Sequence, residues 1–421
     1  MEGALGDEGG AQKQPLLKPA LDAIIVSSIS VLPLFLTAGL AVQISAELNL
    51  SASALGTASA SYFGAQAIFS PLAGAFVDRV GAKVAMRIST FMVAILLLLM
   101  ALFVGSLGSL LVALAIAGAG NAVAQPATNQ FVAERVTITR QGVAYGAKQS
   151  AIPTASLLAG LAVPVLGITF GWRWAFGAFA LLVAFMGLRT PGGRKGARQP
   201  IITAESDEEL SRPLQTLLAF TSGIAATCGT TMGVYLVSSA VATGWSDGTA
   251  GLLFAGASLT GVICRFTAGW QADHFRRDQL VTIALMMIIG ALGSIALMSG
   301  TKPLFVLGAL IAFGFGWGWP GLFIFAVVKL NPARPAAATA FTQVGTAIGA
   351  VTGPLLFGLW IQHHSYAGGW AFVSGGLMIS ALLLLFAGTK IRVEHNRRDG
   401  DLAVTRSREQ GCEDPSDERT V

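Results

Sequence analysis

Residues 74–83 read Gly-Ala-Phe-Val-Asp-Arg-Val-Gly-Ala-Lys, a short polar stretch between two long apolar runs. A related stretch, Gly-Trp-Gln-Ala-Asp-His-Phe-Arg-Arg-Asp, occupies residues 269–278 and also lies between two apolar runs. Asp78 and Asp273 hold the same place in the two copies, separated by about half of the chain. A repeat at this spacing indicates that the chain consists of two related halves.

The composition on both sides of these stretches is that of a membrane protein. Hydrophobic residues make up 53% of the 421 residues and charged residues only 12%, against roughly 25% charged residues in soluble domains. The net charge of +5 comes from Lys and Arg that fall in short clusters between apolar runs. This distribution is typical of loops at a lipid surface and argues against a nucleic-acid-binding protein.

Twelve apolar runs are each long enough for the roughly 20 residues that a membrane-spanning helix needs. They lie near residues 20–46, 52–77, 84–105, 108–132, 142–167, 171–189, 214–242, 248–272, 279–300, 303–330, 336–361 and 370–389. The sequence therefore predicts an all-α membrane protein with twelve transmembrane helices in two pseudo-symmetric six-helix halves.

The polar segments define the predicted domain boundaries. Residues 20–189 and 214–389 are expected to form the two bundles, joined by a flexible linker at 190–213 that contains Gly, Pro and many charges. Residues 1–19 lack the apolar core of a signal peptide and are expected to be an N-terminal tail. Residues 390–421 are polar and mixed in charge, and we expect a disordered C-terminal tail.

The basic residues predict the orientation. With twelve spans, nearly all loop Lys and Arg fall on the side of the two termini, and only Arg173 and Lys302 fall on the other. Because cytoplasmic loops carry the excess of Lys and Arg, both termini and the linker are predicted to be cytoplasmic in a multi-pass protein of the cell membrane.

The segment at residues 74–83 resembles the loop signature of the major facilitator superfamily, and the degenerate copy at 269–278 falls where that family carries its second copy. The resemblance covers about residues 20–390. It implies a secondary transporter that works by alternating access between two rocking halves.

A gating role is implied for six residues of the two loops. These are Gly74, Asp78, Arg79, Gly81, Lys83 and Asp273. Gly74 would let neighbouring helices approach, Gly81 would permit a tight turn, and Asp78 would accept hydrogen bonds from the N-terminus of another helix. The alternative is that Arg79 and Lys83 only fix the topology and contact lipid phosphates.

Two cations lie inside predicted spans, Lys148 in the first half and Arg265 in the second. Charges at membrane depth are costly and commonly functional. A guanidinium can hold a carboxylate by two hydrogen bonds, and a lysine adds a second positive charge. Arg265 also matches the position of the helix-eight arginine in carriers similar to monocarboxylate and oxalate transporters. The alternative for both side chains is that they extend to the membrane interface.

Four neutral polar residues at membrane depth complete the predicted substrate site: Gln149, Gln343, Asn121 and Tyr62. They are candidates for orienting a substrate, although hydrogen bonds between helices are the commoner use of such side chains. Gly345, Gly349 and Gly353 recur at every fourth residue, which favours close helix packing. Trp317 and Trp319, next to Pro320, indicate a bend or a cavity wall.

Other classes of function find little support. The glycine-rich stretches at residues 118–122 and 314–318 lie inside apolar runs, and no phosphate-binding loop is present. We therefore expect no enzyme, no cofactor and no metal site. The leading hypothesis is a carrier of a small organic anion such as a carboxylate, with or without a coupling ion, in contact with membrane lipid. The alternatives are an exporter of neutral or lipophilic metabolites or drugs, and a non-transporting receptor or scaffold.

Overall fold

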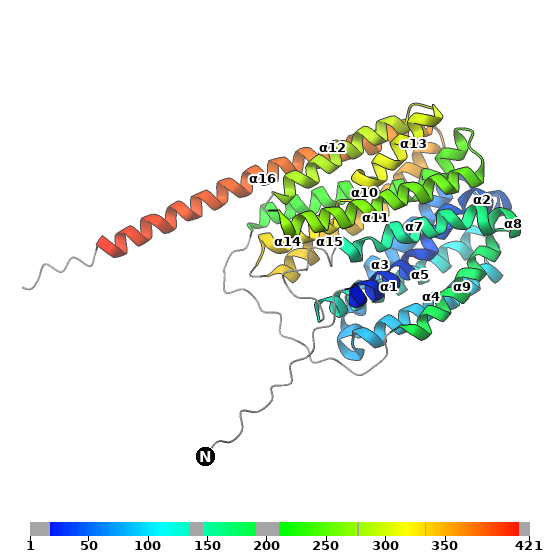
Figure 1. Ribbon diagram of the computed structural model, residues 1–421, viewed down its shortest axis with the longest axis horizontal. Coiled ribbons are helices and arrows are strands. Elements are labelled where there is room, and N and C mark those ends of the chain that lie inside the picture. Colours follow the sequence, from blue (N-terminus) through cyan, green and yellow to red (C-terminus); the bar gives the residue numbers. More distant parts are fainter. Residues whose placement is uncertain (1–16, 135–145, 191–209, 276–277, 333, 412–421) are drawn as a thin grey trace, which may run out of the picture.

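Twelve helical rods run side by side in the computed structural model (Figure 1), which describes residues 17–134, 146–190, 210–275, 278–332 and 334–411. In chain order the elements are α1 (Leu17–Gly39), α2 (Ala41–Leu48), α3 (Ala52–Val80), α4 (Ala82–Phe103), α5 (Leu107–Ala133), α7 (Ala151–Ala162), η2 (Val163–Gly167), α8 (Ile168–Phe170), α9 (Trp172–Arg189), α10 (Arg212–Ala242), α11 (Asp247–His274), α12 (Gln279–Leu297), α13 (Lys302–Ile311), η3 (Ala312–Gly316), α14 (Pro320–Leu330), α15 (Pro335–Ile361) and α16 (Tyr366–Gly411).

Ten segments of the described chain are long and apolar enough to cross a membrane, and α3 and α9 supply the other two rods. The described residues contain helices and no strand. This confirms the predicted all-α membrane fold.

The first and last rods differ from the predicted boundaries. One span was expected over 20–46, but α1 ends at Gly39 and α2 is a separate short helix, because Leu40 between them leaves helical geometry with φ −94° and ψ 13°. The last span was expected to end near residue 389 and to be followed by a disordered tail, whereas α16 continues to Gly411. Two contacts anchor α16 beyond residue 389, Arg392 to Asp278 at 3.1 Å and Glu394 to the Ser211 hydroxyl at 3.0 Å.

The glycines of α15 pack directly on the backbone of α10. A Cβ at Gly345 would lie 1.9 Å from the Ala219 carbonyl oxygen, and one at Gly349 would lie 2.0 Å from that of Gly223. Real Cβ atoms do not approach so closely, so only glycine fits at these places. The run of glycines at every fourth residue is thus a packing face.

Two rods contain a π-helical turn, an irregularity that often marks functional sites. The rod 146–170 has η2, with Pro164 as its second residue, and the rod 302–330 has η3. After η3 the chain makes a turn at residues 317–319 and resumes as α14 at Pro320. Proline lacks the N–H that a continuous helix would require, so the rod 302–330 is interrupted near its middle.

The described loops differ in charge between the two ends of the bundle. The basic end, where α1 begins and the long α16 projects (Figure 1), carries Arg79, Lys83, Arg87, Arg189, Arg212, Lys329, Arg334 and Lys390. The opposite end carries Arg173 and Lys302.

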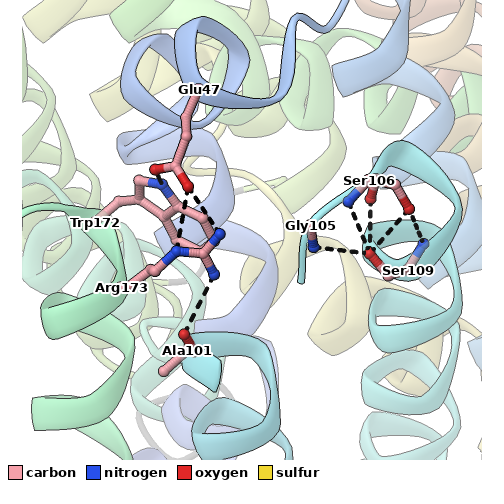
Figure 2. A network of polar contacts seen from close by, with 7 residues as sticks. All are labelled: Glu47, Ala101, Gly105, Ser106, Ser109, Trp172 and Arg173. Carbon is pink, nitrogen blue, oxygen red and sulfur yellow. Dashed lines mark hydrogen bonds and ion pairs between the residues drawn. The ribbon is translucent and has the colours of Figure 1, made fainter. Parts of the chain in front are cut away.

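A polar clamp ties α2 to α4 and α9 at the opposite end (Figure 2). Glu47 accepts hydrogen bonds from the Trp172 indole at 2.6 Å and from Arg173 at 2.8 and 3.2 Å, and Arg173 also donates to the Ala101 carbonyl at 3.3 Å. These hydrogen bonds from Arg173 lower the pKa of the Glu47 carboxyl below its ordinary value.

Candidate functional site

Arg265 of α11 is the central residue of the candidate site. Its side chain is only 2% exposed. Nε and Nη2 donate to the Trp317 carbonyl at 3.2 and 2.5 Å, and Nη1 donates to the Gln149 carbonyl. Trp317 can accept these bonds because it lies where the rod 302–330 is interrupted. The guanidinium therefore links the second half to the backbone of the first half.

Glycines bring the backbones together around this link. A Cβ at Gly146 would lie 2.8 Å from the Arg265 carbonyl oxygen, and one at Gly321 would lie 3.1 Å from the Gly146 Cα. The helical turn 146–149 therefore sits against both α11 and α14. This close approach places the Gln149 carbonyl within reach of Arg265.

Lys148 precedes Gln149 and is also buried, at 6% exposed. Its ammonium donates to the Gln125 side-chain oxygen at 2.9 Å and to that of Asn129, both on α5. The position of Lys148 inside the protein excludes the alternative in which it extends to the interface.

A chain of hydrogen bonds continues from Lys148 into the first half. Gln125 donates to Asn121 at 3.0 Å, the Ser30 hydroxyl donates to Asn121 at 2.7 Å, and the Tyr62 hydroxyl donates to the Ser30 carbonyl at 2.9 Å. Asn121 and Tyr62 are thus buried and bonded between α1, α3 and α5. The two side chains hold neighbouring helices together. Asn121 also orients the Gln125 amide that accepts from Lys148.

Both cations have neutral acceptors only. Among the described side chains, the ion pairs are Arg173 with Glu47 and Arg392 with Asp278, and neither pair includes Lys148 or Arg265. The described residues also contain no group of three or more His, Cys, Asp or Glu that could hold a metal ion. The site is therefore a pair of buried positive charges without a described counter-ion.

The remaining predicted substrate residue lies apart from this site. Gln343 is exposed on α15, and its side chain makes no hydrogen bond to another described residue. Gln149 takes part through its main-chain carbonyl, not through the amide that the sequence suggested.

The predicted gating residues lie at the basic end. Gly81 has φ +87° and forms the turn between α3 and α4. Asp78 and Arg79 are exposed, and the Asp78 carboxylate makes no hydrogen bond or ion pair with any described residue. Lys83 lies in the first turn of α4 and is half-buried. The backbone of Asp273 lies in α11, and its side chain is outside the described part.

The close helix approach predicted at Gly74 is absent in this conformation, because a Cβ there would meet no described atom within 4 Å. The same is true of Gly64 on α3. At the opposite end, α3 does contact the second half: a Cβ at Gly56 would lie 2.3 Å from the Pro354 carbonyl oxygen. The Tyr235 hydroxyl of α10 lies there too, 3.2 Å from the Pro354 carbonyl oxygen.

Three residues outside the predicted set of substrate residues belong to the site. Gln125 and Asn129 hold Lys148, and Phe35 of α1 contacts the Trp317 ring at 5.8 Å between centroids. The two amides stood out as polar residues in an apolar run, but only the fold shows that they face Lys148. Phe35 gives no signal in the sequence, because one phenylalanine in an apolar helix resembles any other.

The family is established by comparison with known families. The profile described as the Major Facilitator Superfamily matches residues 23–222 and 216–409, which together cover most of the chain. The chain therefore belongs to the major facilitator superfamily. It is a multi-pass membrane transporter of a small solute, and transporters of this family are generally not enzymes. No curated protein matches the sequence.

Solved structures agree with this fold. The chain is similar to a bacterial homologue of the human lysosomal transporter Spinster in an inward-facing, occupied conformation, with a TM-score of 0.65 and 14% identity over 90% of this chain and 96% of that chain. The unoccupied inward-facing structure of a bacterial Spinster homologue gives a TM-score of 0.64 and 15% identity with the same coverage.

Proposed function

We propose that this transporter carries a small organic anion, a carboxylate, between its two halves. The observation that carries the proposal is the burial of Lys148 and Arg265 with only neutral acceptors among the described residues. Arg265 donates to the main chain of Gln149, the neighbour of Lys148, and this connection supports a single site that contains both cations.

The electrostatics favour an anionic solute. A buried charge without a counter-ion is unfavourable, and hydrogen bonds to neutral groups offset only part of that cost. A carboxylate would neutralise the charge and would form charge-assisted hydrogen bonds, which are roughly twice as strong as those to neutral acceptors. Substrate binding would therefore replace neutral acceptors with a better one.

The working cycle that we propose is alternating access with the bundles 20–189 and 214–389 as the moving halves. The contact of Gly56 with Pro354 and the hydrogen bond from the Tyr235 hydroxyl to the Ala52 carbonyl at 3.3 Å, both between the halves, support a closed opposite end. The open surroundings of Gly74 and the unbonded Asp78 support an unlatched basic end. In this proposal the protein lies in a cell membrane with its basic end and both termini on the cytoplasmic side. The gating residues would close the basic end when the opposite end opens.

The test is uptake into proteoliposomes. Radiolabelled carboxylates, sugars and cationic dyes are compared for the native protein, Arg265→Gln and Lys148→Gln. Arg189→Gln and Lys302→Gln are matched controls, because they remove the same charges from exposed positions at the two ends of the bundle. Size-exclusion chromatography and thermal unfolding establish that each variant is folded.

We expect carboxylate flux in the native protein and both controls, and a loss of about ten- to a hundredfold in each site variant, the loss typical of a hydrogen bond to a charged group. Carboxylate flux that both site variants retain would exclude the proposal. Movement of only neutral or lipophilic solutes would favour an exporter of such compounds. If no solute moves, and if deletion of residues 390–421 abolishes the function of the protein in the cell, a receptor or scaffold would be favoured.

A further inference from the structure

Trp317 combines the features of a substrate-contacting residue. Its carbonyl accepts two hydrogen bonds from Arg265, and the Arg265 Cζ lies 5.7 Å from the centroid of its ring. The same ring lies 5.8 Å from the ring of Phe35, which belongs to the other half of the protein. Trp317 therefore places an aromatic surface beside the buried guanidinium and at the contact between the two halves.

Glycines of α10 make the room for this ring. A Cβ at Gly229 would lie 2.2 Å from Trp317 Cδ1, and one at Gly233 would lie 2.5 Å from Trp317 Cη2. The Gly233 Cβ would also lie 2.9 Å from the Phe35 ring. Only glycine at residue 233 allows both rings their present positions.

The surroundings of the ring are apolar on the side away from Arg265. Phe313 makes an edge contact with Trp317 at 5.5 Å, and Phe35, Phe313 and Trp317 are all nearly fully buried. A second carboxylate of a substrate would have no described polar partner among these rings, and burying it there would be costly. A flat apolar group would instead gain contact with aromatic faces.

We propose that the preferred substrate is a monocarboxylate with a flat apolar body, whose carboxylate binds Arg265 and whose body inserts between Phe35 and Trp317 as these two rings, in contact in this conformation, move apart. This inference rests on the proposed function and deepens it by naming the substrate class. Because Phe35 and Trp317 lie in different halves, a body held between them contacts both halves at once. Binding sites that are mostly apolar with a few placed polar groups are the common pattern for small molecules.

The experiment measures preference among acetate, 3-phenylpropionate and succinate. Each probe competes for uptake in proteoliposomes, and its binding is measured separately by thermal shift in detergent. The ring variants are Trp317→Leu and Phe35→Leu. The matched control is Phe315→Leu, which removes a ring from the same π-helical turn but from an exposed position. Arg265→Gln is measured in parallel.

We expect the native protein and Phe315→Leu to prefer 3-phenylpropionate over acetate by about tenfold or more, the discrimination that an apolar group typically provides. Trp317→Leu and Phe35→Leu should bring the ratio of 3-phenylpropionate to acetate close to one, whereas Arg265→Gln should weaken all three probes together. If Trp317→Leu does not fold, Phe35→Leu decides the outcome from the other half.

Two results would overturn this inference and leave the proposed function standing, provided that carboxylate binding depends on Arg265. One is a preference for succinate. The other is a preference for 3-phenylpropionate that both ring variants keep. Binding of no carboxylate, or carboxylate binding that is independent of Arg265, would overturn the proposed function and this inference together.

Discussion

The guanidinium of Arg265 donates to the main-chain carbonyl of Gln149, so a side chain of the second half is bonded to the backbone of the first. A main-chain acceptor satisfies the N–H group but leaves the positive charge uncompensated. In the alternating-access cycle proposed above, this bond crosses the surface along which the halves would separate, and it would break during transport. A solute that competes for the guanidinium would then favour that separation.

Replacing Lys148 with Met should separate function from stability. The substitution keeps an unbranched side chain and removes a buried charge without a described counter-ion, so we expect thermal stability to be unchanged or raised. Carboxylate uptake should be lost. Thermal unfolding in detergent and proteoliposome uptake measure the two effects, with Lys302→Met as the exposed control. A large fall in the unfolding temperature would show that Lys148 is mainly structural.

Gly349→Ala should destabilise the contact between α10 and α15. The added Cβ would lie 2.0 Å from the Gly223 carbonyl oxygen, so the helices must move apart. We expect a loss of about 1–3 kcal/mol, typical of overpacking. Gly375→Ala is the control, since a Cβ there meets no described atom within 4 Å. Equal unfolding temperatures for the two variants would contradict the packing interpretation.

Gly81→Ala should be more harmful than Gly74→Ala. Gly81 has φ +87° and ψ 152°, a conformation that side chains other than glycine rarely adopt, and the strain amounts to about 1–3 kcal/mol. Gly74 lies inside α3 with open space around it, so alanine is expected to be neutral for the stability of this conformation. If Gly74→Ala nevertheless slows transport, it must clash in another conformation of the cycle. Unfolding and uptake measurements on both variants test these expectations.

Stability should fall on acidification through the Glu47 clamp. Arg173 lowers the pKa of Glu47 in the folded protein. A lowered pKa means that the stabilisation is fully present above the ordinary glutamate value of 4.5 and is lost as the pH falls through the folded-state pKa. The pair is partly exposed, so the effect should be below about 1 kcal/mol.

Thermal unfolding across this pH range tests the clamp. Glu47→Gln should flatten the pH dependence, and in an Arg173→Gln background the same substitution should change little. An unchanged pH profile in Glu47→Gln would assign the acid sensitivity to other carboxyl groups.

The rods could be predicted from the sequence because each apolar run is long and its ends carry charges or turn residues. Arg265 and Lys148 could be identified for the same reason, since a charge inside an apolar run stands out. Their partners could not be identified, because the acceptors are main-chain carbonyls for Arg265 and two side-chain amides of another rod for Lys148. The break at Leu40 was missed because α1 and α2 form one apolar run, and hydropathy does not report a change of backbone angle.

Trp317 shows most clearly which part of the site could not be predicted from the sequence. Its side chain and Pro320 indicated a bend, but the acceptor for Arg265 is the Trp317 carbonyl, which every residue possesses. Only the interruption between η3 and α14 makes that carbonyl available. Next to this interruption, Gly290 of α12 packs directly on Gly316 at the end of η3. A Cβ at Gly290 would lie 2.2 Å from the Gly316 Cα.

The π-helical turn η3 has a consequence for how this protein can evolve. A π turn contains one residue more than an α turn, so it is equivalent to a single-residue insertion in a helix. Deleting one residue from Ala312–Gly316 would turn the π turn into an α turn, and the flanking segments would keep nearly the same rotation, because the π turn already absorbs the extra residue. The π turn directly precedes Trp317, so we expect the loss of one codon there to shift the carbonyl that accepts from Arg265 while every side chain of the site stays encoded as it is.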